Sequence, residues 1–210
     1  TFQTNGTLIN DRWCEFIREH RIELGVSIDG PAFIHDHNRK SRSGEGTHAR
    51  VIKGVEKLKE HRIPFGCVAV ISDLSLDHPD EIFDFFIELG VDGVGFNIEE
   101  VEGVNDSSSI DAASENRVRG FLQRVYDRNK AAGFPLKIRE FEQVRENILD
   151  PLANVGPDGT YFNLETNPLS MMSVDCFGNF STFSPEMLGQ ATEKYGSFTF
   201  GSMLKGSIFD

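Results

Sequence analysis

Polar and ionisable side chains crowd into residues 27–39, which read SIDGPAFIHDHNR. The apolar run at 24–28 directly before them indicates a β-strand, and the Gly-Pro pair indicates a turn. In α/β proteins, functional groups collect in loops at the carboxyl ends of parallel strands. We therefore predict a functional loop at 27–39, although its residue types alone specify no ligand.

Two predicted strands, at 24–29 and 94–99, carry small and polar residues on one face and apolar residues on the other, since side chains alternate along a strand. The small and polar residues are Gly25, Ser27, Asp29, Gly95, Asn97 and Glu99. If the apolar faces meet helices, the polar faces line a barrel interior or a crevice, which suits a polar ligand. The alternative is that these groups hydrogen-bond one another and nearby backbone.

Helical and strand patterns alternate through the first half of the chain, so that strands near 26, 68 and 96 each follow a helix. Asn10 or Asp11 caps the first helix, and the third runs from Pro79 to Gly90. Parallel strands need such crossovers, which fit a barrel or a doubly wound sheet equally well. Residues 1–4 resemble the end of one more strand.

The pattern changes after the strand at 94–98. An acidic loop at 99–109 precedes a long helix that ends near Gly133, and a further helix stops at Pro151. From Gly156 the chain is rich in turns, and 171–174 and 180–183 flank Asp-Cys-Phe-Gly-Asn as a predicted hairpin.

Composition excludes several classes of protein. Acidic residues outnumber basic ones 33 to 21 among 210 residues, for a net charge of −12, which argues against a nucleic-acid partner. No run of about 18 apolar residues is present to span a membrane, and the first residues lack a signal-peptide pattern. We predict no membrane partner and a cytoplasmic location.

Three cysteines, Cys14, Cys67 and Cys176, lie far apart with no metal-site spacing. Scattered cysteines in a cytoplasmic protein are most often buried thiols, and we expect all three to be buried.

An ordered set of motifs carries a family resemblance. QTNGTLI, VSIDGP, IHDHNR, GTHARVIKGVEKL and HPDEI follow one another between residues 3 and 82, before a strand that ends in Glu-Glu. The set resembles the radical S-adenosylmethionine (radical SAM) peptide maturases with SPASM-type extensions, which include the anaerobic sulfatase-maturating enzymes. GFNIEEVEGVN and SVDCFGNFSTFSPE are most similar to the maturases of glycine-rich-repeat precursor peptides.

The resemblance implies an α/β fold that is part of a parallel (β/α)6 partial TIM barrel. It implies that residues 1–105 form the C-terminal part of the radical SAM barrel, 106–155 a helical connecting segment, and 156–210 the start of a SPASM-like extension containing a β-hairpin.

The resemblance also implies a chemistry. A 4Fe-4S cluster and S-adenosylmethionine would generate a 5′-deoxyadenosyl radical that modifies a ribosomally made precursor peptide by side-chain carbon–carbon crosslinking, with an electron donor as a further partner. The positions that match the family's cofactor-binding segments are Gln3, Thr4, Asn5, Ser27, Asp29 and Arg39. Arg39 would bind the methionyl carboxylate. Strand alternation makes Glu99 the candidate proton acceptor.

Two departures from the family stand out. The CxxxCxxC cluster motif is absent, so we expect the chain to be inactive alone and to be a fragment whose cluster ligands lie upstream. Phe183 stands where many relatives place an auxiliary-cluster cysteine. Two alternatives remain open: a metal-dependent barrel hydrolase that uses His35 and His37, and a non-catalytic peptide-binding module.

Overall fold

The computed structural model describes residues 1–101, 107–152, 155–156, 159–160, 169, 171–182 and 187–206. Its contacts divide the chain into two units, one comprising Thr1–Glu100 and Ser107–Arg145, the other Val101–Asp106 and Glu146–Asp210. The expected division at 105 and 155, into a partial barrel, a helical segment and an extension, stays a prediction.

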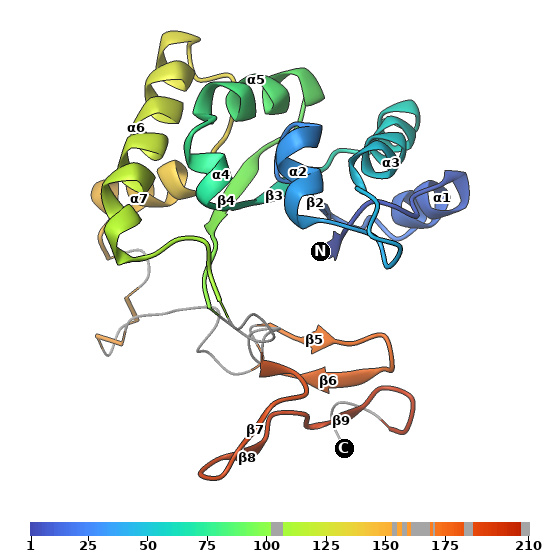
Figure 1. Cartoon of the computed structure of the whole chain (residues 1–210). Coiled ribbons are helices and arrows are strands. Elements are labelled where there is room, and N and C mark those ends of the chain that lie inside the picture. The colour runs from blue at the N-terminus through green and yellow to red at the C-terminus, as the bar shows by residue number, and fades with distance from the viewer. Residues whose placement is uncertain are drawn as a thin grey trace. The chain divides into compact units, whose positions relative to one another are not determined.

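A parallel four-stranded sheet forms the centre of the first unit (Figure 1). Its strands are β1 (Phe2–Thr4), β2 (Leu24–Ser27), β3 (Gly66–Ile71) and β4 (Val94–Ile98), in the order β1-β2-β3-β4. A parallel bridge between Val94 and Ile138 continues the sheet by one position beyond β4. The predicted α/β class and parallel sheet are confirmed.

Crossover helices connect these strands. They are α1 (Asp11–Glu19), α2 (Ala32–Asn38), α3 (His48–Glu60), α4 (Asp73–Leu76) and α5 (Pro79–Leu89), and η1 (Ala112–Ser114), α6 (Glu115–Ala131) and α7 (Arg139–Leu149) follow β4. Local signals set several of their ends: the Asn10 side chain accepts the Trp13 amide at 3.0 Å, Pro79 opens α5, and Gly90 ends it with φ 62°.

One face of the sheet packs against helices. Val26 and Ile28 are fully buried, and Phe96 of β4 contacts Phe86 of α5 and Phe121 of α6. Burial of this apolar face is the main source of the unit's stability. Helices α5 and α6 lie side by side (Figure 1) and are joined at the surface by ion pairs such as Arg124 with Asp80.

The predicted loop at 27–39 is wrong in part, because its second half folds as α2. The Pro31 carbonyl accepts the amides of Ile34 and His35 at 3.0 and 2.9 Å and starts the helix. Both of these side chains are buried, so tertiary packing forms a helix that this short polar sequence does not predict.

The second unit contains short antiparallel strands. β5 (Ser173–Val174), β6 (Asn179–Ser181) and β9 (Gly201–Ser202) form one sheet, and β7 (Ala191–Thr192) pairs with β8 (Gly196–Ser197). The predicted hairpin is confirmed: Asp175 Oδ1 accepts the amides of Phe177 and Asn179, and Gly178 has φ 79°. Phe183 lies outside the described residues.

Across the part of the chain that the structure describes, no helix has both the length and the apolar character that crossing a membrane requires.

Candidate functional site

The sheet face opposite the helices is partly exposed and carries small and polar residues. Gly25 and Ser27 are half-buried and Asn97 is exposed, whereas Val26 and Phe96 are buried on the other face. This alternation confirms the predicted strand faces. The partly exposed face, which we call the open face, is formed by Gln3, Gly25, Gly66, Ser27, Val68, Gly95, Val70 and Asn97.

The Gln3 side chain lies across Gly25 on the open face. Its Nε2 donates to Ser27 Oγ at 2.9 Å. A Cβ atom on Gly25 would lie 2.1 Å from Gln3 Oε1, so only glycine leaves room for this arrangement. The structure thus brings together two predicted cofactor-binding residues from neighbouring strands.

Thr4 and Asn5 shape the turn that follows β1. Thr4 Oγ1 accepts the Gly6 amide at 3.2 Å, and Asn5 Oδ1 accepts the amide and hydroxyl of Thr7 at 3.1 and 2.9 Å. These bonds are local and of the Asx-turn kind. They fix the chain at the carboxyl end of β1, next to Gln3.

Asp29 and Arg39 form a two-point ion pair. Arg39 Nε and Nη2 donate to the Asp29 carboxylate at 2.6 and 2.9 Å, and the Val70 amide donates to Asp29 Oδ1 at 2.9 Å. The Asp29 side chain is 4% exposed and that of Arg39 29%. Asp29 therefore ties the loop after β2 to β3 and holds the Arg39 guanidinium in one orientation.

His35 makes further hydrogen bonds that hold the same loop. Its Nδ1 accepts the Asp29 amide at 3.3 Å, and its Nε2 lies 3.0 Å from Thr47 Oγ1. The Thr47 hydroxyl donates to the Arg39 carbonyl, so it accepts from His35, and we assign the proton to Nε2. Burial lowers the pKa of His35 to about 4, which keeps the ring neutral.

The metal-hydrolase alternative is not supported. Both ring nitrogens of His35 are engaged, whereas His37 is exposed. Among the described residues, no group of three His, Cys, Asp or Glu side chains could hold a metal ion. Asp36, between the two histidines, accepts the His48 amide at the start of α3 at 2.8 Å. Most of the polar side chains at 29–39 thus hold the loop together.

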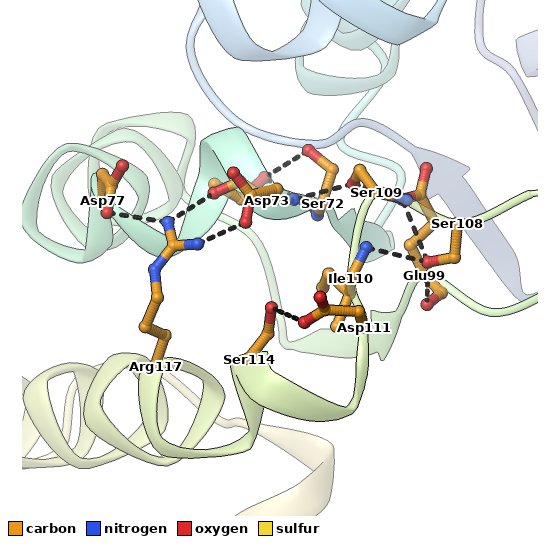
Figure 2. A network of polar contacts seen from close by, with 11 residues as sticks. Ser72, Asp73, Asp77, Glu99, Ser108, Ser109, Ile110, Asp111, Ser114 and Arg117 are labelled. Atoms are coloured by element: carbon orange, nitrogen blue, oxygen red, sulfur yellow. Dashed lines mark hydrogen bonds and ion pairs between the residues drawn. The ribbon is translucent and has the colours of Figure 1, made fainter.

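Glu99 lies at the end of β4 in a polar network (Figure 2). Its Oε2 accepts the Ser109 amide at 2.6 Å and is also bonded by the hydroxyls of Ser108 and Ser109. Ser109 Oγ in turn accepts the Asp73 amide at 2.9 Å, and Arg117 of α6 pairs with Asp73. The network joins the chain after β4 to the chain after β3. The role of Glu99 as a proton acceptor stays a prediction.

The sequence does not predict the second polar side chain over the open face, which is Arg139. Its Nη2 donates to Asn97 Oδ1 at 2.6 Å, and its Nε donates to Glu140 at 2.8 Å. Gly95 lies beneath, and Glu140 Oε2 accepts the Phe96 amide at 3.1 Å. Ile138 pairs with the sheet through a single bridge, too short a strand to leave a periodic signal.

All three cysteines are free thiols. Cys14 and Cys67 are buried and Cys176 is exposed, so the expectation of three buried thiols is wrong for Cys176. It lies in the hairpin turn after Asp175, where the chain must meet solvent. Burial raises the pKa of Cys67 to about 12 and also raises that of Cys14, which makes both poor thiolate ligands.

Comparison with solved structures identifies the fold. A structure of anSMEcpe with bound AdoMet (S-adenosylmethionine) matches with a TM-score of 0.72 at 23% identity, over 99% of this chain and 52% of that one. Streptococcus suis SuiB bound to the precursor peptide SuiA matches with a TM-score of 0.59 at 18% identity, over 96% of this chain and 46% of that one. The fold is that of the radical SAM peptide maturases.

Sequence relatives make the relationship more specific. The chain is 35% identical over 117 residues to the serine-type anaerobic sulfatase-maturating enzyme of Bacteroides thetaiotaomicron, covering 55% of this chain and 28% of that enzyme. It is 41% identical over 211 residues to an uncharacterised protein of Synechocystis sp., covering 99% of this chain and 51% of that protein. The chain is a homologue of the anaerobic sulfatase-maturating enzymes, which confirms the resemblance to that group.

The chain spans about half the length of the Synechocystis relative and 28% of the length of the Bacteroides enzyme. No protein-family model matches it.

Proposed function

We propose that the chain works in a radical SAM enzyme that modifies a ribosomally made precursor peptide. Its homology to sulfatase-maturating enzymes supports this proposal, as does its fold likeness to anSMEcpe and SuiB, which were solved with AdoMet and with the peptide SuiA respectively. The bond formed is proposed to be a side-chain carbon–carbon crosslink, by resemblance to the glycine-rich-repeat maturases. The sheet unit is proposed to belong to a (β/α)6 partial barrel, and the hairpin unit to a SPASM-like extension.

The Gln3 side of the open face is the proposed AdoMet site. The observation that carries this proposal is the Gln3–Ser27 hydrogen bond laid over Gly25, because it presents an amide and a hydroxyl on a half-exposed surface. Such groups fit the ribose hydroxyls of a nucleoside. Thr4 and Asn5, in the adjoining turn, complete the proposed contact surface.

Arg39 is the proposed partner of the methionyl carboxylate. Asp29 takes its Nε and Nη2, and among the described residues Arg39 Nη1 makes no hydrogen bond. A guanidinium fixed on one edge can donate from the remaining nitrogen to an incoming carboxylate. Asp29 is thereby proposed to orient Arg39.

The residues described do not fit a 4Fe-4S cluster. They include no group of three candidate ligands, and the sequence lacks the CxxxCxxC motif. We therefore assign no step to a cluster held by the described residues. In the proposed enzyme other residues would hold the cluster, and an electron donor and the precursor peptide would be its partners. AdoMet, when bound and given one electron by a cluster held by other residues, would supply hydrogen-atom abstraction.

Glu99 is the proposed proton acceptor for crosslink formation. Its Oε2 is held by Ser108 and Ser109, and its Oε1 makes no hydrogen bond among the described residues. A carboxylate oriented through one oxygen can take up a proton at the other. A cytoplasmic location is also proposed.

Calorimetric titration with AdoMet tests the cofactor site. The native gene product, purified anaerobically, should bind AdoMet, and Ser27→Ala and Gln3→Ala should each weaken binding by about tenfold, the value of one polar contact. Thr1→Ala, which removes an exposed hydroxyl bonded to Glu23, is the control and should bind as the parent does. Parent-like affinity in both Ser27→Ala and Gln3→Ala would refute the site.

A further inference from the structure

The open face repeats one arrangement at its two sides. On one side Gln3 lies over Gly25 and is held by Ser27, and on the other Arg139 lies over Gly95 and is held by Asn97. Between them β3 presents Gly66, Val68 and Val70, which carry no polar side chain. Two polar positions are thus separated by an apolar strip.

The second position faces solvent with hydrogen-bond donors. The Nε and Nη2 atoms of Arg139 bind Glu140 and Asn97, and among the described residues its Nη1 makes no hydrogen bond. Because Arg139 donates to Asn97 Oδ1, the Asn97 amide nitrogen is left as a donor, and Asn97 is exposed. Arg139 and Asn97 can therefore each donate to a ligand, and Glu140 already balances the charge of Arg139.

The charge of Arg139 is neutralised by Glu140, and Arg139 and Asn97 each offer a single donor nitrogen to a ligand. Such donors match carbonyl oxygens better than carboxylates, which prefer two parallel hydrogen bonds from one edge of a guanidinium. We propose that Arg139 and Asn97 form a peptide-positioning subsite that donates to main-chain carbonyl oxygens of the precursor peptide. The inference rests on the proposed function, since the peptide substrate is part of that function. It assigns the two sides of the open face to different ligands: AdoMet at Gln3 and Ser27, and the peptide at Arg139 and Asn97.

Glycine substitutions test this division because each displaces one side chain without deleting it. A Cβ on Gly95 would lie 2.6 Å from Arg139 Cζ, and a Cβ on Gly25 would lie 2.1 Å from Gln3 Oε1. Both obstructing atoms are at the far ends of flexible side chains, so the strands themselves need not move. Neither glycine has a positive φ that would oppose alanine.

AdoMet binding is measured by calorimetry. Peptide binding is measured with fluorescein-labelled Cp18Cys and SuiA in the presence of AdoMet, because anSMEcpe was solved with the first peptide and SuiB with the second. We expect the native gene product to bind AdoMet and at least one peptide. Gly95→Ala should weaken peptide binding by about tenfold and change AdoMet affinity by less than about twofold, whereas Gly25→Ala should do the opposite. Arg139→Gln should reproduce the effect of Gly95→Ala.

Arg119→Gln is the control for loss of a charge, because Arg119 is an exposed residue of α6 whose one ion pair among the described residues is with Glu115. It should bind both ligands as the parent does. Parent-like peptide binding in both Gly95→Ala and Arg139→Gln, with AdoMet still bound, would overturn the subsite and leave the proposed function standing. If the parent does not bind AdoMet, or binds neither of the two peptides, both proposals are overturned. Arg139→Gln decides the question if Gly95→Ala does not fold.

Discussion

Asp29→Ala removes a carboxylate that accepts three hydrogen bonds inside the sheet unit. Two come from Arg39, at 2.6 and 2.9 Å, and one from the Val70 amide at 2.9 Å. The Asp29 side chain is 4% exposed and that of Arg39 29%, so the variant leaves a largely buried guanidinium and a backbone N–H without their acceptor.

The expected cost follows from this burial. Breaking a buried ion pair by removing one partner costs about 3–5 kcal/mol. Because Arg39 keeps partial contact with water, we expect the lower end, about 3 kcal/mol, for Asp29→Ala. Asp29→Asn keeps Oδ1 as the acceptor for the Val70 amide and Arg39 Nη2, but it loses the charge and replaces Oδ2, the acceptor of Arg39 Nε, with an NH2 donor. Because two of the three hydrogen bonds remain, its cost should be smaller, about 2 kcal/mol.

Urea unfolding followed by circular dichroism measures both losses. The matched control is Asp80→Ala, because Arg124 also donates two hydrogen bonds to the Asp80 carboxylate, at 2.8 and 2.9 Å. In this pair the side chain of Asp80 is 39% exposed and that of Arg124 53%. Water screens this surface pair, so its removal should shift the midpoint far less. Equal losses at Asp29 and Asp80 would refute the argument that burial sets the strength of the pair.

Three further predictions concern stability and thiol chemistry. Between pH 7 and pH 5.5 the free energy of unfolding should fall by about 1 kcal/mol on account of His35, because the unfolded chain takes up a proton that the folded ring, with its pKa of about 4, does not. Urea titrations at the two pH values should show a smaller fall in His35→Gln than in the parent, and equal falls in the two proteins would contradict this prediction. Gly54→Ala should destabilise the protein by about 1–3 kcal/mol, since its Cβ would lie 2.1 Å from a backbone carbonyl oxygen. Gly120→Ala, whose Cβ would have nothing within 4 Å, should stabilise α6 by about 0.5–1 kcal/mol. Thermal melts in which both variants shift stability in the same direction would contradict the packing argument. A thiol-reactive disulfide reagent should modify exposed Cys176 at once and buried Cys67 only on unfolding, and the chain given iron and sulfide anaerobically should show no cluster absorbance; rapid reaction of Cys67, or stoichiometric cluster uptake, would count against these assignments.

Much of the local structure could be predicted from the sequence, because the signals act within a few residues. Asn10 caps α1, Pro79 opens α5 and Gly90 ends it. The strict alternation of side chains along β2 also places Val26 against the helices and Ser27 on the open face. Of the site, the strand faces were predictable in this way, whereas the cofactor-binding residues come from the family resemblance and stay predictions.

Only the tertiary structure decided which polar groups meet. The partner of Arg39 is the Asp29 carboxylate, and Gln3 meets Ser27 across 24 residues of sequence. Arg139 reaches Asn97 over 42 residues, after two helices and through a single bridge to β4. Such pairings depend on the register between parallel strands, and that register is set by how crossover helices pack rather than by any local residue pattern.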